Sequence, residues 1–378
     1  VMTKPPTILS AIACNLDADI LLAAFPLLEQ ERVEALEWSF DTVFWADQVP
    51  DWFSELLNTY GAQHRLIGHG VFFSLLSAKW TKEQQQWLEQ LKQLSNQFSF
   101  DHITEHFGFF TGQNFHYGAP LPIPYTNTSL RIGQDRLSRI LEACQCPVGL
   151  ENLAFAYSLN EVKRHGEFLE KLVEPVNGFI ILDLHNFYCQ LHNFSVSYEE
   201  LIDLYPLDRV REIHISGGSW EDSVLVPGKR IRRDTHDDTV PEEVFQLLER
   251  TIPQCPNLKY VVLEQLGNGL KTENSKVRFR ADFLRMEALV QKGREDLSPH
   301  FRQSFLPQQP LQLGVVVEDE AFHEQQRQFS HILETVSSFA EAQRLLHSSP
   351  LANTAWGIEH WEPHMLESAV SIAQKWKK

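Results

Sequence analysis

The sequence predicts an α/β protein that folds as a closed (β/α)8 TIM barrel with a small C-terminal helical extension. Short apolar, strand-like runs alternate with amphipathic, helix-like segments from residue 7 to about residue 292. Repeated β-α units imply a parallel sheet. Eight such units over about 290 residues match the size of a closed barrel. A doubly wound open sheet is the alternative architecture.

The expected strands are short and mostly apolar, and they cover residues 7–13, 35–40, 65–70, 98–106, 147–152, 178–183, 210–215 and 259–264. The helices between them have apolar residues at helical spacing, and they cover residues 17–29, 50–60, 81–94, 130–144, 160–172, 198–205, 241–251 and 276–292. Asp17 and Thr81 are typical N-cap residues, and Pro50 suits a first helical position. The long connection over residues 107–126 is rich in Gly, Pro and aromatic residues, and long loops of this kind are usually functional or disordered.

The end of the chain has a different character, so we expect two domains. A catalytic, metal-binding barrel would cover residues 1–300, and a linker with a helical extension would cover residues 301–378. Residues 304–313 read as a Pro/Gln linker, and residues 318–347 and 363–377 have helical spacing. We expect the extension to pack or oligomerise, with docking of a partner or peptide as the alternative. Its histidines are expected on the surface: His331, His347, His360 and His364.

Composition excludes some classes of function. The chain has 33 basic and 50 acidic residues, a formal net charge of −17, which is unfavourable for binding bulk nucleic acid or an anionic membrane. We see no apolar run long enough to span a bilayer and no basic region and cleavage site of a signal peptide at the N-terminus. Five scattered cysteines suit a reducing compartment better than a disulfide framework. We therefore expect a cytoplasmic protein.

Ligand-type side chains end six successive predicted strands. The carboxyl ends of the strands form the active site of a (β/α)8 barrel, so these side chains should meet there. They are His69, His106, Glu151, Asp183, His214 and Glu264, and the loop after residue 215 adds Asp234 and His236. Neutral imidazole and carboxylate groups are natural ligands for divalent iron, zinc or manganese. The alternative for any one of the histidines is a purely structural hydrogen bond.

The number of these side chains indicates more than one metal ion. Four carboxylates and four histidines exceed the roughly four to six ligands that one ion needs. Neighbouring carboxylates without a cation would raise one another's pKa values. Two or more cations would remove that cost, and a carboxylate can bridge two of them. The mixed ligand set suits iron, manganese or zinc, whereas Mg²⁺ or Ca²⁺ would favour oxygen ligands alone.

At these residues the chain resembles a known family, the multinuclear non-haem iron-dependent oxidative enzymes, which includes the methanobactin biosynthesis enzyme. The similarity spans about residues 5 to 293 and rests on the order and spacing of eight motifs. These are HGVFFSLLS at His69, SFDHITEH at His106, PLPIPYT at 120–126, GLENLAFAY at Glu151, ILDLHN at Asp183, EIHISGG at His214, DTHDDTV at Asp234 and VLEQ at Glu264.

The resemblance implies a TIM barrel that holds two or three iron ions, with O2 as cosubstrate. His69, His106 and Glu151 would hold one ion, and Glu151 would bridge to a second that Asp183, His214 and Glu264 hold. A third would use Asp234, His236 and a residue of the His185–Asn186 pair. The resemblance also implies oxidative modification of a ribosomally made peptide at cysteine, commonly with a small partner protein that presents the peptide.

The chain departs from the usual pattern of this family at three places. It has His185–Asn186 where relatives commonly have two asparagines, and this change concerns the third metal site. It also has Gly217–Gly218 where many relatives have a histidine, and Gln265 where a tryptophan is common. These two changes concern the substrate and the reaction.

Two other hypotheses remain open at this stage. A metal-dependent sugar isomerase or phosphodiesterase would also gather His, Asp and Glu at strand ends. An isomerase would usually place a lysine near the metal, and no predicted strand ends on lysine. A phosphodiesterase acting on DNA would want a basic groove, and the net charge of −17 counts against it. Arg230, Arg232 and Arg233 form a local basic cluster, for which a solvated loop is the preferred interpretation and contact with an acidic leader peptide the alternative. The last hypothesis is a scaffold without turnover.

Overall fold

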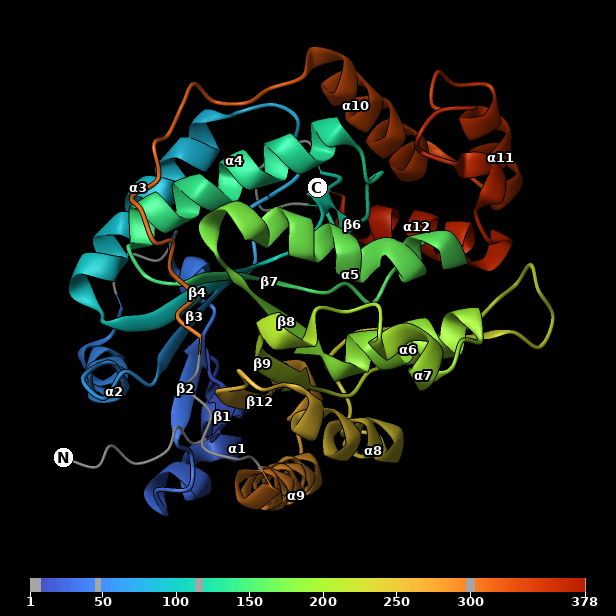
Figure 1. Cartoon of the computed structure of the whole chain (residues 1–378). Helices are drawn as coiled ribbons and strands as arrows, with labels where there is room; N and C mark the ends of the chain where they lie inside the picture. Colours follow the sequence, from blue (N-terminus) through green and yellow to red (C-terminus); the bar gives the residue numbers. More distant parts are fainter. Residues whose placement is uncertain (1–7, 45–48, 113–117, 297–302, 378) are drawn as a thin grey trace.

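The predicted closed barrel is confirmed in the computed structural model, which describes residues 8–44, 49–112, 118–296 and 303–377 (Figure 1). The barrel strands are all parallel, in the order β1-β12-β9-β8-β7-β4-β3-β2. They are β1 Leu9–Ala13, β2 Ala35–Trp38, β3 Leu66–Gly70, β4 Phe100–His106, β7 Val148–Glu151, β8 Phe179–Asp183, β9 Val210–Ile215 and β12 Tyr260–Leu263. Closure excludes the doubly wound open sheet.

Helices surround the barrel, as the alternating pattern predicts (Figure 1). They are α1 Ala18–Glu29, α2 Asp51–Gly61, α3 Lys82–Gln97, α4 Asn127–Cys144, α5 Leu159–Val173, α6 Leu184–Phe194, α7 Tyr198–Ile202, α8 Glu242–Thr251 and α9 Glu273–Asp296. Short 3₁₀ helices are η1 Phe40–Val43, η2 Glu174–Val176, η3 Leu207–Arg209, η4 Ile252–Gln254 and η5 Gly267–Gly269. The expected cap at Thr81 is present, because its side chain accepts from the Gln84 backbone while the Gln84 side chain accepts from the Thr81 backbone.

Three features differ from the expected elements. Helix α6 follows β8 without a loop, because Asp183 both ends the strand and caps the helix, accepting from the backbone N–H of Asn186 at 2.6 Å. The long connection after β4 contains a small antiparallel pair, β5 Phe109–Phe110 and β6 Pro120–Leu121. A second hairpin after β9 consists of β10 Trp220–Asp222 and β11 Arg230–Arg232.

The strand register brings the candidate ligands to one end of the barrel. His106 pairs with Glu151 between β4 and β7, and Asp183 pairs with His214 between β8 and β9. Both pairs stand at or next to the last residue of their strands, and His69 is next to the last residue of β3. Because all these strands run in the same direction, the pairs lie at a similar height at the carboxyl end.

The C-terminal extension consists of α10 Glu320–Thr335, α11 Phe339–His347, η6 Ile358–His360 and α12 Pro363–Trp376. These helices, orange to red in Figure 1, gather to one side of the barrel. They contact four loops that follow barrel strands: Asp319 N donates to Ala78 O (3.1 Å), Trp376 O accepts from Gly118 N (3.0 Å), Glu362 N donates to Tyr157 O (2.8 Å) and Glu367 Oε1 accepts from Val224 N (2.9 Å). The extension therefore packs against the rim that carries the candidate ligands.

The core of the extension is continuous with that of the barrel. The Trp361 ring stacks on the Tyr157 ring with 3.9 Å between centroids, and both belong to the same buried apolar cluster as Phe329 and Trp356. His331, His347 and His360 are exposed as expected. The prediction for His364 is wrong, because this residue is buried on α12.

Parts of three sequence-based predictions lie outside the described residues: residue 7 of the first strand, residues 113–117 of the long loop and the expected domain boundary at 300/301. The division into two domains stays a prediction. In the part of the chain that is described, no helix combines the length and the apolar character needed to cross a membrane.

Candidate metal centre

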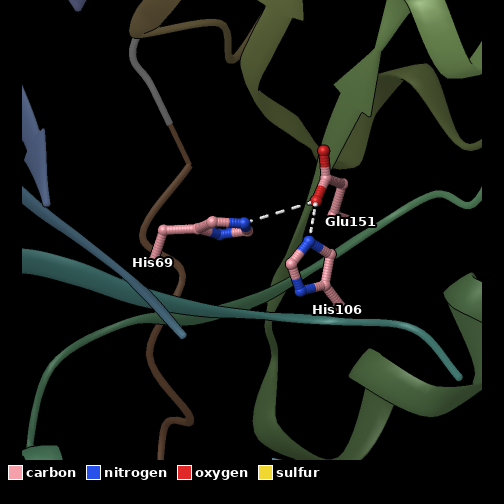
Figure 2. Close-up of side chains that lie close together, drawn as sticks. All are labelled: His69, His106 and Glu151. Atoms are coloured by element: carbon pink, nitrogen blue, oxygen red, sulfur yellow. Dashed lines mark ion pairs between the residues drawn. The ribbon is translucent and has the colours of Figure 1, made fainter. Parts of the chain in front are cut away.

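His69, His106 and Glu151 form a compact group at the carboxyl end of the barrel. Figure 2 shows that both imidazole rings approach one oxygen of the carboxylate. Oε2 of Glu151 is 3.4 Å from Nε2 of His69 and 3.2 Å from Nε2 of His106. The His69 and Glu151 side chains are almost completely buried, whereas the His106 side chain is 24% exposed.

The other oxygen of Glu151 faces a second group. Oε1 of Glu151 is 3.3 Å from Nδ1 of His214, which is also 3.5 Å from Oε2 of Glu264. One ligand atom from each of Glu151, Asp183, His214 and Glu264 lies within 4.8 Å of the others. The two carboxylate oxygens of Glu151 therefore point to two adjacent groups, which is the arrangement that a bridging ligand requires.

The hydrogen bonds of His69 leave its inward nitrogen free to bind a metal. The Thr104 hydroxyl is 3.2 Å from the carbonyl oxygen of Gly68, to which it donates. It therefore accepts from Nδ1–H of His69, which lies 2.8 Å away. We assign the neutral ring the tautomer that leaves a lone pair on Nε2. This lone pair and the Glu151 carboxylate are two acceptors that face each other, an arrangement that a shared cation would stabilise.

Several ligand atoms of these two groups are buried without a hydrogen-bond partner. Among the described residues, no hydrogen-bond partner reaches His69 Nε2, Asp183 Oδ2, His214 Nδ1 or Glu264 Oε2. Buried polar atoms in proteins are usually hydrogen-bonded, so this concentration in one place requires an explanation. The donor set of imidazole nitrogens and carboxylate oxygens fits iron, manganese or zinc, and ions between these atoms would satisfy them.

The electrostatics of the group support the same interpretation. Burial raises the pKa of Asp183 well above its ordinary value, and the negative charges of Asp234 and Glu151 raise it further. Burial also lowers the pKa of His106 to about 4. For His69, burial opposes protonation, but contacts with Glu151 and the charge of Glu37 outweigh it and raise the pKa to about 10. Divalent cations would compensate the carboxylates without these conflicting protonation states.

His185, Asp234 and His236 form a third cluster, in which a hydrogen bond joins His185 to Asp234 and an ion pair joins Asp234 to His236. Oδ1 of Asp234 is 3.0 Å from Nδ1 of His185 and 2.7 Å from Nε2 of His236. The Arg232 guanidinium donates from Nε to Nε2 of His185 at 3.0 Å. Nδ2 of Asn186 donates to the carbonyl oxygen of Asn152 at 2.8 Å. In the described ranges, the groups of His, Cys, Asp or Glu that bring at least three ligand atoms within 4.8 Å of one another do not contain His185, Asp234 or His236.

Several positioning residues are absent from the set derived from the sequence. Asn152 accepts from the backbone N–H of Asp183 at 2.7 Å and donates to its carbonyl oxygen at 3.1 Å, which fixes the end of β8. Glu37 and Glu212 are fully buried and each has a carboxylate oxygen 3.1 Å from Nε2 of His214. The period-2 alternation of a strand could have indicated Glu212, because it shares a face with His214.

The loop after Glu151 provides a test of pH-dependent stability. Burial lowers the pKa of His165 to about 3, and Nε2 of this ring accepts from the backbone N–H of Leu153 at 3.1 Å. The unfolded chain protonates this residue near pH 6.5. The stabilising contribution is therefore present above pH 6.5 and is lost as the pH falls toward 3.

His165→Gln keeps an acceptor for Leu153 but does not titrate. Between pH 7 and pH 5, we expect the wild-type protein to lose about 2 kcal/mol more unfolding free energy than this variant. Urea unfolding of metal-free protein at the two pH values measures the difference. Equal pH dependence in the two proteins would show that His165 protonates normally in the fold.

The chain matches a protein family model and is similar in sequence to several known proteins. The model of a family described as "RiPP precursor modification enzyme MbnB/TglH/ChrH" matches residues 31–272. A UPF0276 protein from Acaryochloris marina is 28% identical over 192 residues, which cover 50% of this chain and 66% of that protein. A UPF0276 protein from Caulobacter vibrioides is 27% identical over 182 residues, which cover 48% and 62%. The chain thus spans less than two-thirds of the length of these relatives.

Solved structures with a similar chain trace are more distant. A xylose isomerase domain protein from Planctomyces limnophilus is 15% identical, with a TM-score of 0.48, and the match covers 78% of this chain and 99% of that chain. Endonuclease IV from Thermus thermophilus is 12% identical, with a TM-score of 0.47, and the match covers 74% and 99%. These likenesses are too weak to assign a substrate. The family model, by contrast, matches residues 31–272, a region that includes all ten candidate ligands and excludes the C-terminal extension.

Proposed function

Because the chain belongs to the family of RiPP precursor modification enzymes described by MbnB, TglH and ChrH, we propose that it is a non-haem iron-dependent enzyme that oxidises a ribosomally made peptide. The modified residue would be a cysteine, and O2 would be the cosubstrate. Bound iron would supply the redox chemistry, and manganese or zinc could occupy the same ligands.

The observation that carries this proposal is the position of Glu151 between two histidine-containing groups. Its Oε2 faces His69 and His106, and its Oε1 faces His214. His69, His106 and Glu151 would hold one ion. Asp183, His214 and Glu264 would hold a second, with Glu151 shared between the two. A thiolate of the peptide is a soft ligand that could complete either site.

We propose two ions in this chain rather than three, because the contacts within the third cluster leave it poorly suited to hold an ion. Nε2 of His185 accepts from Arg232, and Nδ1 of the same ring faces Asp234. Both ring nitrogens are therefore engaged, and the guanidinium brings a positive charge to the place where another cation would need ligands. We propose that Arg232 takes over the charge compensation of Asp234 in this chain.

The peptide would reach the centre at its exposed rim. The side chains of His106 and Asp234 are each 24% exposed, and those of His236 and Glu264 are 15% and 14% exposed. The extension contacts four of the loops that frame this end of the barrel. We propose that the extension, as a unit separate from the barrel domain, contributes to peptide binding, with or without a small partner protein that presents the peptide.

Metal content of protein purified without oxygen tests the proposal. Elemental analysis with Mössbauer spectroscopy should find two irons per chain. His69→Ala and Asp183→Ala should each remove one of the two irons, because each deletes a ligand from one of the two groups. His331→Ala, on the exposed face of α10, serves as the control and should keep the wild-type iron content.

The same measurement can contradict the proposal in two ways. A single zinc or manganese without iron uptake would favour the hydrolase or isomerase hypothesis. Protein that binds no metal under any condition would exclude both enzymatic hypotheses. Two bound irons would justify mass spectrometry with cysteine-containing peptides in the presence of O2.

A further inference from the structure

A row of buried acidic and basic side chains continues from His214 into the interior of the barrel. Nε2 of His214 is 3.1 Å from Oε1 of Glu212, and Oε2 of Glu212 is 2.6 Å from Nε2 of His102. Nδ1 of His102 lies 3.0 Å from Oδ2 of Asp101. The side chains of His214, Glu212 and His102 have no solvent exposure. The row thus joins the metal centre to the start of β4.

The far end of this row is anchored by cations. Asp101 accepts from Nη2 of Arg211 at 2.8 Å and also from Nζ of Lys259. Burial would raise the pKa of Asp101, but contacts with His102, Arg211 and Lys259 outweigh it and hold the pKa far below the ordinary value. The His102 ring is fixed from its sides by the rings of Phe179 and Tyr260, at centroid distances of 4.7 and 5.5 Å.

The two nitrogens of His214 therefore have different environments. Nε2 faces two carboxylates, because Oε2 of Glu37 is also 3.1 Å away, and both favour a proton on this nitrogen. Nδ1 is then left with a lone pair that points toward Glu151 and Glu264. Histidine ligands commonly donate their second N–H to a carboxylate, which fixes the tautomer and raises the basicity of the ligand. His69 has only a neutral hydroxyl, that of Thr104, in the equivalent place.

We propose that Glu212 and His102 are positioning residues that hold His214 in the Nε2–H tautomer and so set the affinity of the second metal position. This inference rests on the proposed function, because it assumes that His214 binds a metal. It adds that the two metal positions differ in what sets their affinity for the metal. The position that contains His214 depends on the buried row, and the position that contains His69 and His106 does not.

The test compares Glu212→Gln with the wild type in the full-length chain. Zn²⁺ serves as a diamagnetic probe, and chelator competition resolves the two binding steps. We expect about 10–100-fold weaker affinity for the step that depends on His214 and little change in the other step. ¹⁵N NMR of histidine-labelled, zinc-loaded protein should show Nε2–H with metal on Nδ1 in the wild type, and loss of this signal in the variant.

Matched variants separate positioning from general damage to the fold. Glu287→Gln removes a different buried carboxylate, which lies on α9 and pairs with Arg32, and should leave both steps unchanged. His102→Gln keeps an N–H donor for Glu212 and should bind zinc more tightly than His102→Leu. This pair also keeps the test decisive if Glu212→Gln fails to fold.

Three results would overturn the inference. The first is a Glu212→Gln variant with wild-type affinity and tautomer. The second is equal weakening of both steps. The third is loss of one whole metal equivalent with the remaining affinity unchanged, which would make Glu212 a ligand. Failure of the proposed function looks different, because the wild-type protein would then bind no metal, or a single zinc or manganese without iron uptake.

Discussion

Glu151→Gln should remove both metal ions, whereas every other single substitution among the proposed ligands should spare one position. The reason is geometric, because each oxygen of this carboxylate faces a different group. An amide has one acceptor oxygen and turns N–H donors toward one of the two groups. Loss of an outer partner of a ligand costs about 10–100-fold in metal affinity. Loss of the shared ligand should therefore cost more than about 100-fold at both positions.

Iron analysis of the anaerobically purified variant measures this effect, and Glu161→Gln provides the control. Burial raises the pKa of Glu161 to about 8, so its carboxyl is mostly protonated near neutral pH, and glutamine is a close replacement. The control should keep the wild-type iron content. A Glu151→Gln variant that retains one iron with wild-type affinity would show that the carboxylate serves a single ion.

The sequence predicts the barrel and most of the strand-end group because both depend on local patterns. Each apolar run is long enough for one strand, and the polar residue that ends it has no place in an apolar core. In a parallel barrel this rule brings together His106 and Glu151, whose strands pair in register. The same rule works for Asp183 and His214. The metal roles of these residues remain predictions.

The acidic residues that sequence reasoning misses lie inside strands rather than at their ends. Glu37 and Glu212 stand within short strands and look like ordinary interruptions of an apolar run. Their significance depends on which face of the strand they occupy. Period-2 counting back from His214 reaches Glu212, and counting back from His106 reaches His102 through Thr104. This count is a usable signal for the buried row.

The placement of the C-terminal extension does not follow from local patterns. A surface position is expected for His364, as for the other histidines of the extension, but α12 packs against the rest of the protein and buries it. The contacts that place the extension come from loops that are far away in sequence, such as the one that carries Tyr157. Such long-range packing is determined by the three-dimensional arrangement of the loops and leaves no periodic trace in the sequence.

Trp361→Ala should open the extension while leaving the barrel folded. Trp361 is 8% exposed, stacks on Tyr157, and donates from its indole nitrogen to the carbonyl oxygen of Trp356 at 3.0 Å. Phe329 packs edge-on against the same ring. Truncation of a buried tryptophan costs about 3–5 kcal/mol. We expect this loss in the free energy that protects α10 to α12 from local opening.

Hydrogen exchange with mass spectrometry measures that free energy separately for each segment. If residues 301–378 form a unit of their own, the amides of α10 and α12 should exchange much faster in the variant. The strands of the barrel should keep their protection, and the iron content should not change, because every proposed ligand lies between residues 69 and 264. Trp52→Ala, a 52% exposed tryptophan on α2, should change protection by no more than about 0.5 kcal/mol. Equal loss of protection in the barrel and the extension would instead mean that the two fold as one cooperative domain. The stack between Trp361 and Tyr157 would then couple the extension to the barrel core.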